Sequence, residues 1–280
     1  AGGTTPWGTI LTCEENFDLF YGDGVSKGNY QWERYYDNPT EHYGWVVEVN
    51  PFNGSAKKLT ALGRFSHESA TTKKATNGKI VVYSGDDKKN EHLYKFISKT
   101  PDSLEDGDLY VADTLNGKWL PLDIKKNIKL KNKFKNQLDL LINTRDAAKL
   151  VGATPLDRPE DIEINPKTGD VFVCLSNNKS NDNYHGSILK IKEKNNDPLS
   201  LSFTASSFLV GGSSFSCPDN IVFDKNGNLW LANDISGSKI GKKPYEKFGN
   251  NGLYFIPMNG PHTGKPLKVA SAPTQSEITG

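Results

Sequence analysis

The chain has 280 residues, with 34 Lys and Arg against 33 Asp and Glu, so its formal net charge is only +1. Because neither sign of charge dominates, composition gives no reason to expect a nucleic-acid or membrane-surface partner. Hydrophobic residues make up 35 % of the chain, and no apolar run approaches the roughly 18 residues that a membrane-spanning helix needs. We therefore expect a folded protein with no nucleic-acid and no membrane partner.

The two ends of the sequence resemble internal cuts. The chain begins at Ala1 without a Met or a signal peptide, and it stops at Gly280 directly after an extended-looking segment. We therefore expect residues 1–280 to be a single domain of a monomeric protein, truncated at both ends. A lost targeting segment leaves the compartment open.

Short apolar strands separated by turn sequences dominate the chain. Most are four to seven residues long and rich in Val, Ile, Phe, Tyr and Trp, with Asn-Gly or Pro-containing turns between them. The predicted strands are 8–13, 44–49, 79–84, 92–97, 108–112, 162–165, 170–175, 186–192, 203–210, 220–224, 228–232 and 252–257.

One region favours helix instead. Residues 134–150 carry regularly spaced Leu and Ala, with a break at Asn143, after which we expect Thr144 to cap a second short helix. Six lysines lie just before it, between 125 and 135. We interpret residues 125–150 as a small solvated helical insertion, with an anion-attracting patch as the alternative.

An internal repeat is the main signal in the sequence. Residues 159–173 (PEDIEINPKTGDVFV) and 218–231 (PDNIVFDKNGNLWL) describe the same hairpin, and a looser copy begins at His67. An acid opens each first strand, and a turn glycine follows it. The acids are Glu68, Glu160 and Asp219, and a further 58 residues from Asp219 lead to Glu277.

A repeat of 50–60 residues built from short antiparallel strands is typical of β-propeller blades. Equivalent positions in successive blades face one another around the propeller axis, so these acids would converge at one end of it. Converging carboxylates repel one another and lose hydration, which costs several kcal/mol per ion unless a cation neutralises them. We therefore predict an all-β propeller with a multivalent metal site; the simpler alternative is that each acid faces solvent beside its turn.

Cys13 suggests which metals are involved. It ends a predicted strand and is followed directly by Glu14 and Glu15. Oxygen ligands alone suit calcium, magnesium or manganese, whereas a thiolate suits iron or zinc. A transition metal near Cys13 with calcium on the acids is one interpretation, and a merely packed thiol is the other. Cys174, inside an apolar strand, is interpreted as a buried small hydrophobe.

Arg158 directly precedes the second repeat. Its planar guanidinium can bind carboxylate or phosphate through two parallel hydrogen bonds. Beside a cation site it would bind an anionic substrate; otherwise it forms a surface pair with Asp157. Asp86, Asp87 and Asn178 follow second strands, and we interpret them as turn residues more readily than as further ligands.

Several segments of the chain resemble the PhoX family of bacterial alkaline phosphatases. The resemblance runs in the right order over nearly the whole chain. The segments are TPWGTILTCEE (5–15), GWVVEVNP (44–51), ALGRFSHE (61–68), GDD (85–87), LVGATPLDRPEDIE (150–163) and CPD (217–219).

This resemblance implies a fold, an activity and a site. Members of the family are exported, usually by a twin-arginine signal, and fold as six-bladed propellers. They hydrolyse small-molecule phosphate monoesters with iron and calcium bridged by an oxo group. The resemblance implies Fe³⁺ and Ca²⁺ as cofactors, a periplasmic or secreted location, and Arg158 as the phosphate-binding catalytic residue. The implied metal ligands are Cys13, Glu14, Glu68, Glu160, Asp219 and Glu277.

The predicted function is therefore metal-assisted hydrolysis of phosphate monoesters, and no Ser/His/Asp arrangement competes with it. One alternative is a non-catalytic, calcium-stabilised propeller that acts as a binding module. The other is a propeller esterase or lactonase that uses a single calcium.

Overall fold

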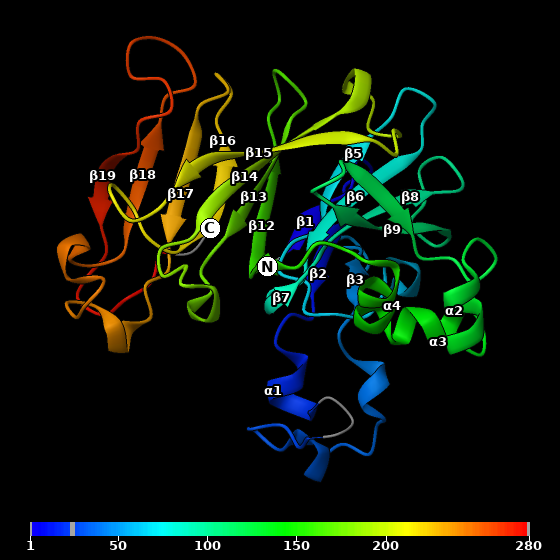
Figure 1. The fold of residues 1–280 in the computed structure, drawn as a ribbon. Helices are drawn as coiled ribbons and strands as arrows, with labels where there is room; N and C mark the ends of the chain where they lie inside the picture. The colour runs from blue at the N-terminus through cyan, green and yellow to red at the C-terminus, as the bar shows by residue number, and fades with distance from the viewer. Residues whose placement is uncertain (1, 23–25, 279–280) are drawn as a thin grey trace. The chain divides into compact units, whose positions relative to one another are not determined.

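The structure, a computed structural model, describes residues 2–22 and 26–278 (Figure 1). It is mostly β, and its described residues fall into two compact units. Among these residues no helix is both long enough and apolar enough to cross a membrane. The single-domain organisation over 1–280 stays a prediction. The first unit comprises 1–87, 92–154 and 197–202, and the second comprises 88–91, 155–196 and 203–280.

Two antiparallel sheets form the first unit. The four-stranded sheet has the order β1-β2-β3-β4, and the five-stranded sheet has the order β10-β9-β8-β6-β5. Nearly all neighbours in the sheets are also neighbours along the chain, as in a meander. The strands are β1 (Gly2–Thr4), β2 (Ile10–Cys13), β3 (Val46–Val49), β4 (Ala56–Lys58), β5 (Thr71–Lys74), β6 (Ile80–Gly85), β8 (Leu93–Ser98), β9 (Gly107–Asp113) and β10 (Lys118–Pro121).

Two four-stranded antiparallel meanders form the second unit, with a short pair of strands, β7 and β11, beside them. Figure 1 shows β16 to β19 side by side in chain order. The strands are β7 (Lys89–Glu91), β11 (Leu156–Asp157), β12 (Pro159–Ile164), β13 (Val171–Leu175), β14 (Ser187–Glu193), β15 (Phe203–Val210), β16 (Pro218–Phe223), β17 (Leu229–Asn233), β18 (Gly252–Ile256) and β19 (Leu267–Ser271).

Every strand predicted from the sequence is present to within a few residues. The strands that the pattern misses include short or polar ones, such as β4 with its sequence Ala-Lys-Lys, and β19, whose five residues are all exposed. The turns of the two clear repeats have Gly169 at φ 76° and Gly227 at φ 84°, which glycine adopts without the steric cost of a Cβ. Cys174 is fully buried, as predicted.

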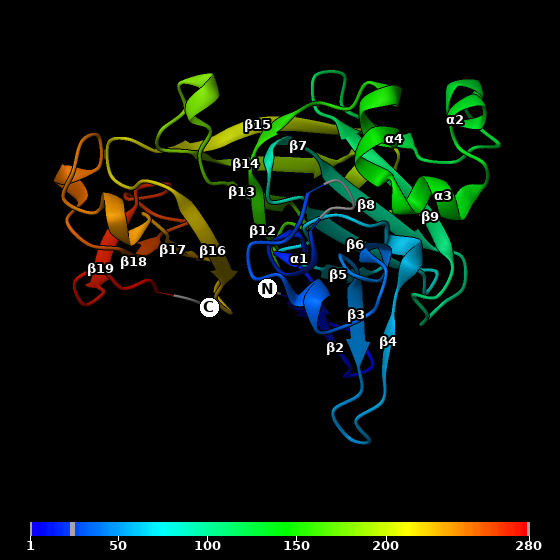
Figure 2. The same ribbon diagram turned by 90° about the horizontal axis from the view of Figure 1, so that it is seen from below.

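The helical insertion is real, and it contains one more helix than expected. Its helices are α2 (Ile128–Lys133), α3 (Gln137–Ile142) and α4 (Thr144–Val151), which lie together in Figure 2. The break at Asn143 is confirmed, but Thr144 does not cap α4. Its hydroxyl instead donates to the Leu141 carbonyl at 2.6 Å and accepts from the Arg64 N–H at 3.1 Å. The six lysines of the insertion are all exposed.

The insertion packs onto the core of the first unit. Leu130, Leu140 and Ala147, one from each helix, are fully buried in the same apolar cluster as Ile80 and Tyr94 of the sheet. Burial of apolar surface, which contributes a free energy of about 25 cal/mol per Å², therefore attaches the helices to the sheet.

A buried ion pair makes a second attachment. Arg145 of α4 donates to both carboxylate oxygens of Asp86, at 2.7 and 2.6 Å, and to the Ser66 hydroxyl at 3.0 Å. Asp86 is fully buried, so it acts here as a structural anion. The neighbouring His67 is also buried; burial, together with the charge of Arg145, lowers the pKa of His67 to about 3. His67 is therefore neutral and bonds to Ser84 and Gly63.

Loss of Arg145 should destabilise the first unit strongly. The Arg145→Ala variant leaves the Asp86 carboxylate buried without its bidentate cation, and we expect a loss of about 3–5 kcal/mol in the free energy of unfolding. Urea titration followed by circular dichroism measures it. Lys149→Ala, which removes an exposed cation from the same helix, should change the unfolding free energy by no more than about 0.5 kcal/mol. Equal effects of the two changes would show that the buried pair is not a main attachment.

Candidate metal centre

The three acid-bearing hairpins share one backbone irregularity. In each, the first strand carries one more residue than its partner between two paired positions, which defines a β-bulge. Glu160, Asp219 and Glu68 are each the first residue inside the bulge. A bulge redirects side chains out of the regular alternation, so the same device presents all three acids. The flanking pairs are Pro159–Leu175 and Ile162–Val173, Pro218–Asn233 and Ile221–Leu231, and His67–Asp86 and Thr71–Tyr83.

The residue before the proline that opens each of the hairpins 159–173 and 218–231 is held in an unusual conformation. Arg158 has φ 59° and Cys217 has φ 51°, in the left-handed region that side chains other than glycine rarely adopt. Their carbonyls accept equivalent hydrogen bonds, from the Ser176 N–H at 3.1 Å and the Asp234 N–H at 3.0 Å. Such a conformation costs about 1–2 kcal/mol per residue. Its occurrence at equivalent positions identifies a strained local structure that both repeats share, next to their acids.

Within the second unit the bulges bring two carboxylates together. Glu160 and Asp219 are 3 % and 8 % exposed, and one oxygen of each lies within 4.8 Å of the other. Two oxygens bound to one Ca²⁺ at about 2.4 Å each are at most about 4.8 Å apart. The donors are hard oxygens, the type that calcium prefers, so this pair fits a calcium ion.

Asp161 connects the two strands that carry these acids. Its carboxylate accepts from the Ile221 N–H of β16 at 2.9 Å and from the Ile162 N–H at 2.8 Å. Burial raises the pKa of Asp161 to about 7, and the nearby charges of Glu163 and Asp219 act in the same direction. Asp161 therefore lies close to two further acids, Glu163 and Asp219.

Glu277 belongs to the same acidic region. Partial burial raises its pKa, and the charges of Asp234 and Asp219 raise it further. Sequence reasoning identified Glu277 and Asp219 but missed Asp234. Asp234 directly follows the second strand of its hairpin, as Ser176 does in the hairpin that carries Glu160, and this position is the signal that could have identified it.

Arg158 is oriented toward the acids. Its Nη2 lies 2.6 Å from Glu160 Oε1, and its Nη1 donates to the Ser176 hydroxyl at 3.3 Å. Asp157 accepts hydrogen bonds from Asn181 and Asn183, at 2.8 and 2.9 Å. Arg158 thus places a fixed positive charge beside the buried Glu160 carboxylate. An anion bound beside this carboxylate would also contact the Arg158 charge.

The other predicted ligands lie in the first unit. Glu68 is 7 % exposed at its bulge, and Cys13 is half-buried at the end of β2. Glu14 has structural partners: its Oε2 accepts from the N–H groups of Gly44 and Trp45, at 3.0 and 3.1 Å, and its Oε1 lies 2.6 Å from Lys58 Nζ. These bonds fix the Glu14 carboxylate in place. Metal ligation by Cys13, Glu14 and Glu68 stays a prediction.

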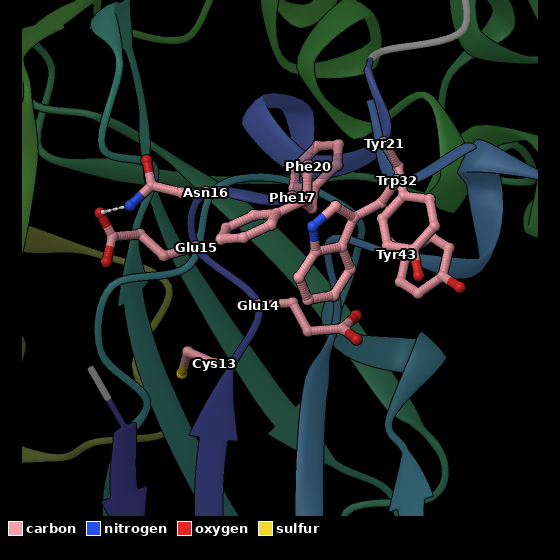
Figure 3. A pocket seen from close by; sticks show the side chains of 9 residues that line it. All are labelled: Cys13, Glu14, Glu15, Asn16, Phe17, Phe20, Tyr21, Trp32 and Tyr43. Carbon is pink, nitrogen blue, oxygen red and sulfur yellow. Dashed lines mark hydrogen bonds between the residues drawn. The ribbon is translucent and has the colours of Figure 1, made fainter. Parts of the chain in front are cut away.

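A pocket adjoins Cys13 and Glu14, and sequence reasoning did not predict it. Its volume is about 410 Å³, and Figure 3 shows the Cys13 and Glu14 side chains pointing to opposite sides of the chain where β2 ends. Aromatic rings form much of its wall. The lining residues are Cys13, Glu14, Glu15, Asn16, Phe17, Phe20, Tyr21, Trp32 and Tyr43.

Four-stranded antiparallel meanders are the blades of a β-propeller, and in this chain buried acids lie on repeated bulges of such sheets. The family model for alkaline phosphatase PhoX matches residues 1–280, and the chain belongs to this family. No curated protein matches the sequence.

One solved structure agrees with the family. "Pseudomonas fluorescens PhoX in complex with vanadate, a transition state analogue" is similar to this chain with a TM-score of 0.84 and 31 % sequence identity. The similarity covers 98 % of this chain and 60 % of that chain, so this chain spans less than two thirds of its relative's length. It confirms the predicted fold class, a β-propeller. An ulvan lyase of family PL25 bound to -[GlcA(1-4)Rha3S]- gives a TM-score of only 0.34 at 12 % identity, over 76 % of this chain and 47 % of the other.

Calcium should stabilise this centre through its acids. At a free calcium concentration of about 100 times the dissociation constant, binding adds about 2.7 kcal/mol to the free energy of unfolding. We expect Asp219→Asn to lose this gain, and to be more stable than the wild-type chain in EDTA because one of two neighbouring buried charges is gone. Differential scanning calorimetry with calcium and with EDTA measures both. The exposed acid Glu246 provides the control, Glu246→Gln, which should keep the full calcium response. An undiminished response in Asp219→Asn would contradict the assignment.

Proposed function

We propose that this chain hydrolyses phosphate monoesters at a centre of iron and calcium ions. Membership of the alkaline phosphatase PhoX family supports the reaction class. The relative at 31 % identity was solved with vanadate, described as a transition state analogue. The observation that carries the proposal is the pair of buried carboxylates, Glu160 and Asp219, with Arg158 beside them.

The proposed ligands divide by chemistry. The Cys13 thiolate would favour iron. Calcium would be held by the carboxylates of Glu14, Glu68, Glu160, Asp219 and Glu277. Glu68 is included because it occupies the same place in its bulge as Glu160 and Asp219. When bound, such cations polarise phosphoryl oxygens and help to generate a nucleophile near neutral pH.

Arg158 is proposed to bind the phosphate. Its backbone is held by the Ser176 N–H, and its guanidinium already lies within 2.6 Å of an anion, the Glu160 carboxylate. Five fixed N–H donors match the oxygens of a phosphoryl group, and their charge stabilises the transition state as negative charge spreads over it. Lys in this position would offer only a point charge.

Family membership also supports a small-molecule phosphate ester as the substrate and a periplasmic or secreted location. The monomeric state stays a prediction from sequence.

Hydrolysis of p-nitrophenyl phosphate, combined with elemental analysis, tests the proposal. We expect activity that a chelator removes and added calcium restores, with iron and calcium both present in the protein. Glu160→Gln should lower kcat/KM by at least about 100-fold, the size of effect seen when one electrostatic group of an active site is removed. Cys13→Ser should lose iron, and Glu246→Gln should keep wild-type activity and metal content.

The alternatives give other outcomes. Calcium without iron and without any hydrolysis would support the calcium-stabilised binding module. Calcium without iron, with hydrolysis of phenyl acetate but not of the phosphate, would support the esterase. Phosphatase activity unchanged by both Glu160→Gln and Cys13→Ser would remove the proposed site.

A further inference from the structure

The aromatic pocket beside Cys13 is a preformed feature of the first unit. Tyr21 stacks on Tyr43 with ring centroids 3.6 Å apart, and Phe20 meets Trp32 edge-on at 4.8 Å. Tyr21 also contacts Trp32 at 5.9 Å. In Figure 3 the Trp32 ring lies between Phe17 on one side and the tyrosines on the other.

Burial and a contact with a lysine hold several of these rings in place. Tyr21 and Phe17 come from α1 (Phe17–Tyr21) and are buried. Lys58 Nζ lies 4.7 Å from the centroid of the Tyr43 ring. Trp32 comes from a short 3-10 helix, Trp32–Arg34, and keeps 41 % of its surface exposed. A ring that is both held and open to solvent is suited to packing against a ligand.

Both carboxylates on the pocket wall have hydrogen-bond partners. The Glu14 carboxylate bonds to Lys58 and to two backbone N–H groups, and Glu15 accepts from the Asn16 amide at 2.9 Å. The lining residues include no Lys or Arg, so an anionic group would find no cation among them. The wall favours a neutral, aromatic group, and a volume of about 410 Å³ accommodates one or two fused rings.

We propose that this pocket is a subsite for the alcohol part of the substrate, and that it selects phosphate monoesters whose alcohol carries a neutral aromatic ring. The inference rests on the proposed function, because Cys13 and Glu14 are both proposed metal ligands and wall residues of the pocket. A phosphate bound to a cation that Cys13 and Glu14 hold would have its ester group beside the pocket that both residues line. The rings of Trp32, Phe20 and Tyr43 then pack against that group.

The test compares 2-phenylethyl phosphate with ethyl phosphate, whose leaving alcohols are both simple primary alcohols. In the metal-loaded wild-type protein we expect kcat/KM to favour the phenylethyl ester. Trp32→Ala should reduce this preference by about tenfold, the factor expected for loss of a large aromatic contact. Trp32→Phe should restore most of it. Tyr35→Ala, which removes a 79 %-exposed ring that does not line the pocket, should leave the preference unchanged.

Binding measurements separate this inference from the proposed function. Calorimetric titration with phenylphosphonate and methylphosphonate needs no turnover. A phenyl preference in binding that Trp32→Ala removes supports the subsite even if no ester is hydrolysed, and in that case only the phosphatase proposal fails.

Two results would overturn the subsite. The first is a wild-type protein with no phenyl preference in turnover or in binding, or a preference that Trp32→Ala leaves intact. The second is a Trp32→Ala effect that is larger for choline phosphate than for 2-phenylethyl phosphate, because the pocket would then recognise positive charge.

Discussion

Two buried carboxylates held close together are the constraint on which the rest of the account depends. At a separation of about 5 Å and an effective dielectric constant of about 20, two negative charges repel by about 3 kcal/mol. Glu160 and Asp219 are within that range, and the Asp161 carboxylate ties their strands together through the Ile221 N–H. Arg158 compensates part of this charge. A divalent cation compensates more of it, and it does so with the oxygen ligands that calcium prefers.

The fold creates this proximity by repeating one local device. Each acid-bearing hairpin has a bulge at the same place, and in the second unit the residue directly before each of the two hairpins, Arg158 or Cys217, has a positive φ. Backbone strain of this kind persists only where surrounding structure over-determines it, and it gathers at functional sites. The paired strands of the meanders stabilise the fold. The bulges give the acids defined positions outside the regular alternation of a strand.

The sequence predicts the parts of this arrangement that depend on local pattern. The hairpins around Glu160 and Asp219 were predictable because their alternating apolar residues and glycine turns are local signals. The three donors on Glu14 and the charge of Asp234 on Glu277 were not, since each depends on tertiary contacts. The aromatic pocket was missed for the same reason. Its rings lie in a region without alternation, where α1 is only five residues long and Tyr21 meets Tyr43 through tertiary packing.

The most direct measurement is an anomalous difference map from crystals of the calcium-loaded protein, collected at a wavelength where calcium scatters anomalously. We expect a peak between the carboxylates of Glu160 and Asp219, with oxygen distances of about 2.3–2.6 Å. A map without a peak there, with both side chains turned to solvent, would contradict the claim that a cation makes their closeness tolerable.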